Sequence, residues 1–286
     1  MSKRTLKANI VLCPLIFLFI TLHRIFSVDV HDVQFDYRYF ILYIIIIMDY
    51  KDLSTSILRE RQLETSAAFP VLMRKVYLWM TFALLITGFT AYYVASSEAI
   101  LYTIIANQGI FWGLVIAEFV LVFALSAAIN KLSLTVATIM FVLYSVINGA
   151  TLSFILLLYT ASSVVNVFLI TAGTFAAMAL YGYFTKTDLM SWGKYLVMAL
   201  IGLIIATIVN LFTKSSGLEM ILNYLGVLIF VGLTAYDSQK IKQMMLQATD
   251  TGEGAQKIAL IGALSLYLDF INLFIYLLRI LGSKRD

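Results

Sequence analysis

The sequence is poor in charge and has little cysteine, histidine or proline. Of its 286 residues, 13% are charged and 62% are hydrophobic, whereas a soluble domain carries about 25% charged residues. The single cysteine, Cys13, excludes an intrachain disulfide and a multi-cysteine metal site. The net charge of +4 is too weak and too dispersed to indicate nucleic-acid binding. This composition excludes a disordered chain and a soluble enzyme, and it predicts a multi-span helical membrane protein.

The rare residue types cluster at the N-terminus. Both histidines, the cysteine and one of the two prolines precede Met48, which begins an ordinary polar segment. We therefore expect residues 1–47 to be a doubtful N-terminal extension, with translation starting at Met48. A signal-like segment is a competing interpretation, because basic residues precede a 13-residue apolar stretch from Ile10 to Leu22. An extra membrane helix is a third.

Seven apolar runs after Met48 approach the ~20 residues that a transmembrane helix needs. The connections between them are short, so sequential helices are expected to be neighbours. The predicted fold is all-α: a polytopic membrane protein with a seven-transmembrane-helix bundle over residues 76–286, preceded by a cytoplasmic segment at residues 48–75. The seven runs are Val76–Ala95, Ile110–Ala128, Leu132–Leu158, Val164–Phe184, Tyr195–Phe212, Leu218–Tyr236 and Ile258–Ile280.

The distribution of basic residues predicts the orientation. The loops expected on one side contain almost all of them, whereas the opposite loops contain only Lys214. The positive-inside rule then places the N-terminus in the cytoplasm, and we expect a bacterial inner membrane. The basic tail conflicts with this rule, since seven full crossings put it outside. Either the early loops dominate or the last helix does not fully cross. The tail residues are Arg279, Lys284 and Arg285.

Several glycines lie within the apolar runs. Small residues allow helix backbones to approach closely in lipid. We therefore expect tight helix packing at Gly88, Gly113, Gly149, Gly173, Gly182, Gly202, Gly226, Gly232 and Gly262.

Three carboxylates lie at positions where ionisable groups are costly. Glu118 is central in the second run, Asp237 follows the sixth, and Asp269 is midway along the seventh. An ionisable group at membrane depth is unfavourable unless it is paired, hydrated or neutralised. Each also has a structural interpretation: Asp237 reaches water or pairs with Lys240, Glu118 bonds to a neighbouring helix, and Asp269 is a purely structural buried acid.

The helical rise links the two aspartates. If the sixth helix continues to Met245 and the seventh begins near Lys257, Asp237 and Asp269 lie about 12 Å and about 18 Å from the same end of the bundle. Two carboxyls that meet cannot both ionise cheaply, so they would share a proton. The pair would then act as a pH-sensitive latch, joined when one is protonated and pushed apart when both are charged.

The last helix also has one polar stripe. Ser265, Asp269 and Asn272 recur at spacings of four and three, which places them on one face. The rest of that helix is apolar, so we expect it to lie centrally with the stripe facing a cavity. The full stripe is Gly262, Ser265, Asp269, Asn272, Tyr276 and Arg279.

These motifs resemble a known family. The segments YDSQKI at positions 236–241 and ALSLYLDFINLF at 263–274 resemble the last two helices of the Bax inhibitor-1 family, including bacterial members. Tyr144, Asn148 and Gly149 are also similar to that family. The resemblance extends over about Ile57 to Leu281.

The resemblance implies a seven-helix bundle with a central last helix and a calcium leak gated by pH. It implies that Asp237 and Asp269 are the proton-sharing pair and that Glu118 is the family's acidic residue in the second helix. Some members have a basic latch partner near the end of that helix, where Lys131 and Asn130 are the candidates here.

A weak calcium site is chemically reasonable. Ca²⁺ prefers six to eight oxygen ligands, and a leak needs weak binding so that ions can leave. We assign a weak site to Asp237 and Asp269 and an ion pathway to Glu118, Ser265 and Asn272. The expected partners are calcium, protons and the lipid bilayer, with calcium as the permeant ion and no cofactor or enzymatic activity.

Other functions use the same carboxylates. A proton-coupled transporter would show saturable substrate uptake instead of passive leak. An intramembrane aspartyl protease of the presenilin type needs Gly-x-Gly-Asp at its second aspartate, whereas Asp269 follows Leu-Tyr-Leu. A regulatory or scaffold membrane protein would carry no flux in liposomes.

Overall fold

The computed structural model describes the backbone of residues 37–248 and 250–285, and the side chains from Ala67 onward except at positions 101, 105, 108 and 111. The greater part of the expected N-terminal extension, residues 1–36, lies outside the described residues. The chain divides into two compact units, residues 1–59 and 60–286. Helix α2 (Tyr37–Ser96) continues without a break across the expected segment boundaries at residues 47 and 75.

The described chain is almost entirely helical. Six helices are long and apolar enough to cross a membrane, and a shorter apolar segment, Trp112–Ala128, lies in α4. The all-α, polytopic prediction therefore holds. The count of seven membrane spans is not confirmed, because six of the described helices qualify and the segment in α4 is shorter. The connection expected at 96–109 contains a short helix, α3. The other elements are α3 (Glu98–Ala106), α4 (Gln108–Ala128), α5 (Leu134–Leu158), α6 (Ala161–Phe184), η1 (Met190–Trp192), α7 (Gly193–Thr213), α8 (Ser216–Leu246) and α9 (Glu253–Leu281).

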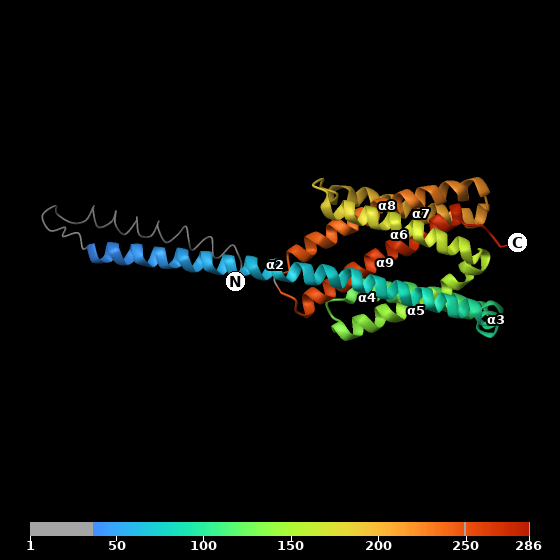
Figure 1. Cartoon of the computed structure of the whole chain (residues 1–286), viewed down its shortest axis with the longest axis horizontal. Coiled ribbons are helices and arrows are strands. Elements are labelled where there is room, and N and C mark those ends of the chain that lie inside the picture. The colour runs from blue at the N-terminus through green and yellow to red at the C-terminus, as the bar shows by residue number, and fades with distance from the viewer. Residues whose placement is uncertain (1–36, 249, 286) are drawn as a thin grey trace. The chain divides into compact units, whose positions relative to one another are not determined.

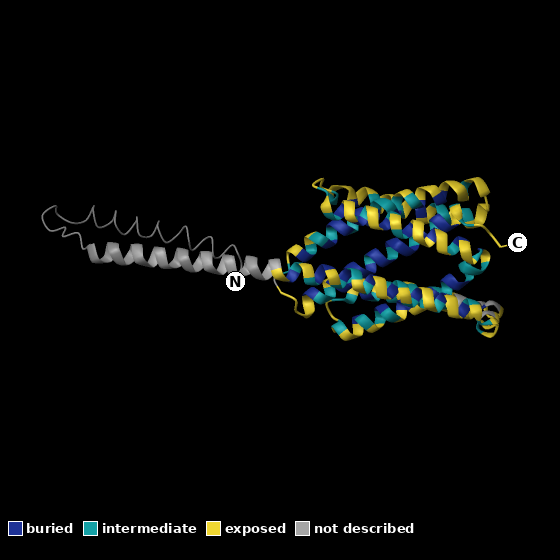
Figure 2. Cartoon of the chain, in the orientation of Figure 1, coloured by how far each residue is buried: buried dark blue, intermediate teal, exposed yellow. Residues whose placement is uncertain are grey.

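Helix α9 lies in the middle of the 60–286 unit. It packs against α5, α6 and α8, while α4 packs on α5 and α7 packs on α8. Figure 1 shows α9 between the α6–α8 group and the helices α4 and α5. In its most apolar stretch 67% of the residues are buried, against 6% in α7. Figure 2 shows the same contrast, with buried residues along α9 and exposed residues on the outer helices.

Hydrogen bonds at both ends show that α9 crosses the whole bundle. At its start, Glu253 Oε1 accepts a bond of 3.0 Å from the backbone N–H of Leu134, the first residue of α5. Beyond its end, the backbone N–H of Arg285 donates to the Leu158 carbonyl at 2.9 Å, the last residue of α5. Helix α9 therefore runs parallel to α5 from one end to the other. Of the two alternatives for the basic tail, this arrangement favours a last helix that extends along the whole bundle.

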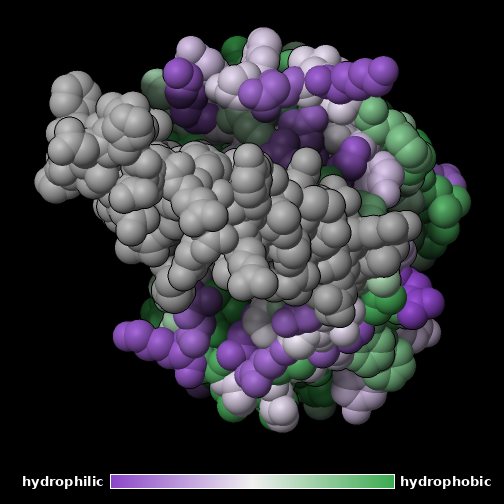
Figure 3. All heavy atoms as spheres, turned by 90° about the vertical axis from the view of Figure 1, so that its left-hand side faces the viewer, coloured by the Kyte–Doolittle hydropathy of each residue, from purple (hydrophilic) through white to green (hydrophobic). Residues whose placement is uncertain are grey.

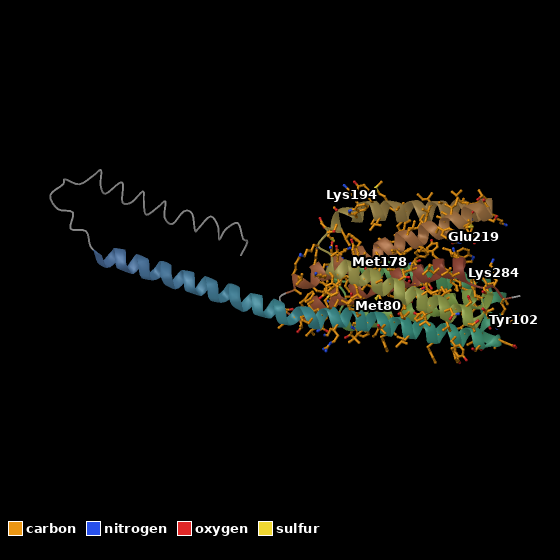
Figure 4. All side chains as sticks on the ribbon, turned by 45° about the horizontal axis from the view of Figure 1, so that its top comes forward. Met80, Tyr102, Met178, Lys194, Glu219 and Lys284 are labelled. Carbon is orange, nitrogen blue, oxygen red and sulfur yellow. The ribbon has the colours of Figure 1, made fainter. Side chains whose placement is uncertain are left out.

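The two ends of the bundle are polar and the flanks are apolar. Lys194 lies at one end, and Tyr102, Glu219 and Lys284 lie at the other (Figure 4). Figure 3 views the bundle from the Lys194 end, where hydrophilic side chains gather around the margin and hydrophobic ones lie along the flank. Large side chains such as Phe212 and Phe89 are 83% and 72% exposed. This pattern is the one expected of a protein surrounded by lipid.

Glycines make close helix contacts at only some of the expected positions. A Cβ added at Gly182 of α6 would collide with the Ala235 carbonyl of α8, and one added at Gly149 of α5 would lie 2.6 Å from the Thr87 carbonyl of α2. Such contacts require glycine at these two crossings. Side chains of neighbouring helices also lie close to Gly226, Gly232 and Gly262. The packing expectation is wrong at Gly88, Gly113, Gly173 and Gly202, because a Cβ there would meet nothing within 4 Å.

Candidate functional site

Asp237 and Asp269 come together between two antiparallel helices. Helix α8 extends to Leu246, as expected, and α9 begins at Glu253, one turn earlier than expected. Asp269 is 5% exposed, and Asp237 is close enough to it for the two carboxyl groups to interact electrostatically. This proximity agrees with the depth argument from helical rise, while the role of the pair stays a prediction.

The hydrogen-bonding capacity of this pair is only partly used. Asp269 Oδ2 is buried and has no hydrogen-bond partner among the described residues. Lys240 acts electrostatically on Asp237, but no ion pair within 4 Å joins these two side chains in the described part of the chain. Lys240 Nζ instead lies over the Tyr236 ring, 5.7 Å from its centroid. A buried carboxyl oxygen without a partner is expected to carry a proton or to contact an ion or water.

The polar stripe of α9 packs against α8, which corrects the expectation that it faces a cavity. Tyr276 stacks on Phe230 with ring centroids 5.8 Å apart, and its ring lies against Gly226 of α8. Ser265 and Asn272 are both half-buried, and Asn272 donates to the Leu268 carbonyl of its own helix at 2.8 Å. The stripe is therefore a helix–helix seam with the aspartate pair within it.

Glu118 belongs to a second cluster. Thr151 Oγ1 of α5 donates a short bond of 2.6 Å to Glu118 Oε1, and the Asn148 side chain also donates to this carboxylate. This is the structural interpretation considered for Glu118, a hydrogen bond to a neighbouring helix. The carboxylate also interacts electrostatically with Tyr144 and Tyr267.

Tyr267 connects this cluster to α2 and α9. Its hydroxyl donates to Asn148 Oδ1 at 3.0 Å and lies 2.7 Å from Thr87 Oγ1, which in turn donates to the Ser145 carbonyl at 3.0 Å. The Tyr267 and Thr87 hydroxyls each have one hydrogen to donate, and together they make three close polar contacts. Tyr267 is fully buried, and its ring meets Tyr144 edge-on at 5.8 Å.

The two clusters lie on opposite faces of α9. Tyr267 and Asp269 are two residues apart, which is a rotation of about 200° on an α-helix. Tyr267 faces α2 and α5, and Asp269 faces α8. The structure therefore brings the aspartates together but places Glu118 across the central helix from them.

The two candidate latch residues are at the surface. Asn130 and Lys131 lie in the exposed turn after α4, and no ion pair of Lys131 occurs in the part of the chain that the structure describes. In this region Glu253 instead joins α9 to α5: its carboxylate accepts a hydrogen bond from the Leu134 N–H and forms a 2.9 Å ion pair with Lys257.

Clustered metal ligands do not occur in the described residues, where no group of three or more His, Cys, Asp or Glu side chains could hold an ion. A resident, tightly bound metal needs more protein ligands than two carboxylates.

The sequence profile of a family described as "Inhibitor of apoptosis-promoting Bax1" matches residues 70–286. The chain belongs to the Bax inhibitor-1 family. The inner membrane protein YbhL of Escherichia coli (strain K12) is 48% identical over 221 residues, covering 77% of this chain and 94% of YbhL. An uncharacterised protein of Borreliella burgdorferi is 47% identical over 214 residues, covering 75% and 92% of the two chains. One from Rickettsia prowazekii is 42% identical, covering 75% and 90%.

This Bax inhibitor-1 family member contains polar residues that the sequence reading missed. Thr87, Thr151 and Tyr267 were not assigned any role, because threonine and tyrosine are common in membrane helices. One signal could have found Tyr267: it lies two residues before Asp269, on the opposite face of the last helix.

Proposed function

We propose that the chain is a pH-sensitive calcium leak channel gated by Asp237 and Asp269. One observation carries the proposal: two carboxyl groups on adjacent helices lie close enough to interact electrostatically, and one oxygen of Asp269 is buried without a partner among the described residues. Like charges in such a site cannot both be stable. One shared proton therefore holds α8 and α9 together, and its loss separates them.

The second cluster supports a path for the ion. Separation of α9 from α8 strains the contacts on the other face of α9, where Tyr267 bonds to Thr87 and Asn148. When those bonds break, Glu118 loses part of its cover and its carboxylate attracts a cation. Ser265 and Asn272, beside Asp269, supply neutral oxygens for weak coordination.

The orientation and location follow the same reasoning. Exposed apolar flanks and six long apolar helices support a location in a bilayer, and the relative YbhL is an inner membrane protein. With the basic loops in the cytoplasm, the Lys194 end of the bundle is the cytoplasmic end.

The test is calcium flux in proteoliposomes that contain only the purified chain. The wild type should leak more at alkaline pH than at acidic pH, because deprotonation opens the pair. Asp269→Asn should remove the pH dependence, since an amide neither shares nor loses the proton. The matched control is Asp188→Asn, an exposed loop carboxylate, which should behave like the wild type. Flux with an unchanged pH profile in Asp269→Asn would refute the gating role.

A proton-coupled transporter is the alternative, since the same buried carboxyl could carry a proton across the membrane. It predicts uptake that saturates with substrate concentration. Linear calcium leak by the same proteoliposomes decides between the two.

A further inference from the structure

An apolar cavity lies on a different face of the bundle from the aspartate pair. Its volume is about 530 Å³, and α2, α5, α6 and α9 line it near the end of the bundle where the chain terminates. Phe168, Phe270 and Phe274 form much of its wall. None of the carboxylates discussed above borders it.

The cavity communicates with the lipid-facing surface. Two of its lining residues, Tyr92 of α2 and Val165 of α6, are 71% and 57% exposed. Gly88 of α2, also in the lining, has open space where a Cβ would project. The gap between these helices therefore admits a flexible apolar group from the side. In a bilayer the neighbouring apolar groups are acyl chains.

One charged side chain borders the cavity, and it is a cation. Arg285 lies in the lining, and its backbone N–H bonds to the Leu158 carbonyl at 2.9 Å. Two residues earlier, the backbone N–H of Ser283 donates to Ser163 Oγ at 2.9 Å, and the Ser283 carbonyl accepts from the Thr160 N–H at 3.0 Å. These three bonds fix the tail across the α5–α6 connection. The backbone of Arg285 is thus held at the polar end of an apolar slot, within reach of its lining. Guanidinium groups bind phosphate in a bidentate manner.

We propose that this cavity binds one anionic phospholipid, with an acyl chain between α2 and α6 and its phosphate at Arg285. The shape, lateral opening and single cation match a molecule that is apolar along its length and anionic at one end. Thr87 borders the cavity and also contacts the Tyr267 hydroxyl. A bound acyl chain therefore touches the polar network that holds α9.

The test is native mass spectrometry of the full chain in detergent, titrated with phosphatidylglycerol or with phosphatidylcholine of the same acyl chains. Phosphatidylglycerol should give a one-lipid adduct about tenfold tighter than phosphatidylcholine, because both lipids carry the phosphate but the quaternary ammonium of phosphatidylcholine repels the arginine. Arg285→Gln should remove that difference. Its control is Lys284→Gln, an exposed neighbour that does not line the cavity, which should retain it.

A second pair of variants tests the acyl-chain site. Gly88→Leu fills the slot and should abolish the adduct, whereas Gly202→Leu makes the same change at an open, exposed position of α7. Both should remain monodisperse, because neither meets a neighbouring atom at Cβ. Equal lipid retention by the two glycine variants, or equal affinity for the two lipids in the wild type, would overturn the proposal.

Discussion

The hydroxyl of Tyr267 lies within hydrogen-bonding distance of two helices at once, 3.0 Å from Asn148 Oδ1 on α5 and 2.7 Å from Thr87 Oγ1 on α2. Because Asn148 also bonds to Glu118, this hydroxyl joins the central helix to the carboxylate across the bundle. Asp269 lies on the opposite face of the same helix, two residues along. In the proposed closed state, polar contacts therefore anchor both faces of α9 at nearly the same level.

Removal of the Tyr267 hydroxyl should loosen α9. Tyr267→Phe leaves Asn148 Oδ1 buried and unbonded, and we expect a loss of about 1–3 kcal/mol in the free energy of unfolding. Calcium leak at acidic pH should rise, because one anchor of the closed state is missing. Thermal unfolding in detergent and proteoliposome flux measure the two effects. Tyr102→Phe, at a tyrosine that is 74% exposed, should change neither.

Substitutions at Glu118 and Asp269 should affect different properties of the flux, its size and its pH dependence. Glu118→Gln keeps the shape of the side chain but removes the charge that attracts the cation, so flux should fall by roughly tenfold, or about 1.4 kcal/mol in the barrier. Its pH dependence should persist, because the gate is intact. Glu98→Gln, at the exposed start of α3, is the control. Loss of pH dependence in Glu118→Gln would place the sensor at Glu118.

The two aspartates should behave as one unit. Asp237→Asn and Asp269→Asn should each remove the pH dependence of flux, and the double variant should resemble either single one. Groups that act together give non-additive effects, whereas independent groups add. Additive changes in the double variant would show that the carboxyls titrate separately.

Two glycines of α6 should respond oppositely to alanine. A methyl group at Gly182 collides with the Ala235 carbonyl, so Gly182→Ala should destabilise the bundle by about 1–3 kcal/mol through overpacking. Gly173→Ala adds its methyl to open space and should leave stability unchanged or raise it by up to about 1 kcal/mol. Thermal unfolding of the two variants in one detergent provides the comparison.

Some features followed directly from the sequence. The seven apolar runs all became helices, since a run of apolar residues at this length has few other stable forms in lipid. The meeting of Asp237 and Asp269 followed from helical rise and a short antiparallel connection. The energetic cost of burying a carboxyl singled out Glu118, Asp237 and Asp269 before any neighbour was known, and their roles stay a prediction.

Other features depend on the rotation of each helix, which one sequence does not determine. The packing rule for glycine holds at Gly149 and Gly182 but not at Gly88 or Gly173, because the neighbouring helix touches only one face. The same uncertainty hid Tyr267, whose partners come from residues more than a hundred positions away. It also concealed that the central helix lies between Glu118 and the aspartates.

The central claim is that loss of a shared proton separates α8 from α9, and a distance between spin labels on these helices tests it most directly. Cys13 is the only native cysteine, so Cys13→Ser gives a background for labels at Leu246→Cys and Ile258→Cys, two exposed positions near the connection. The account predicts longer label distances at alkaline pH than at acidic pH in lipid, and no such change once Asp269→Asn is added. Identical distances at both pH values, in samples whose calcium flux still changes with pH, would contradict it.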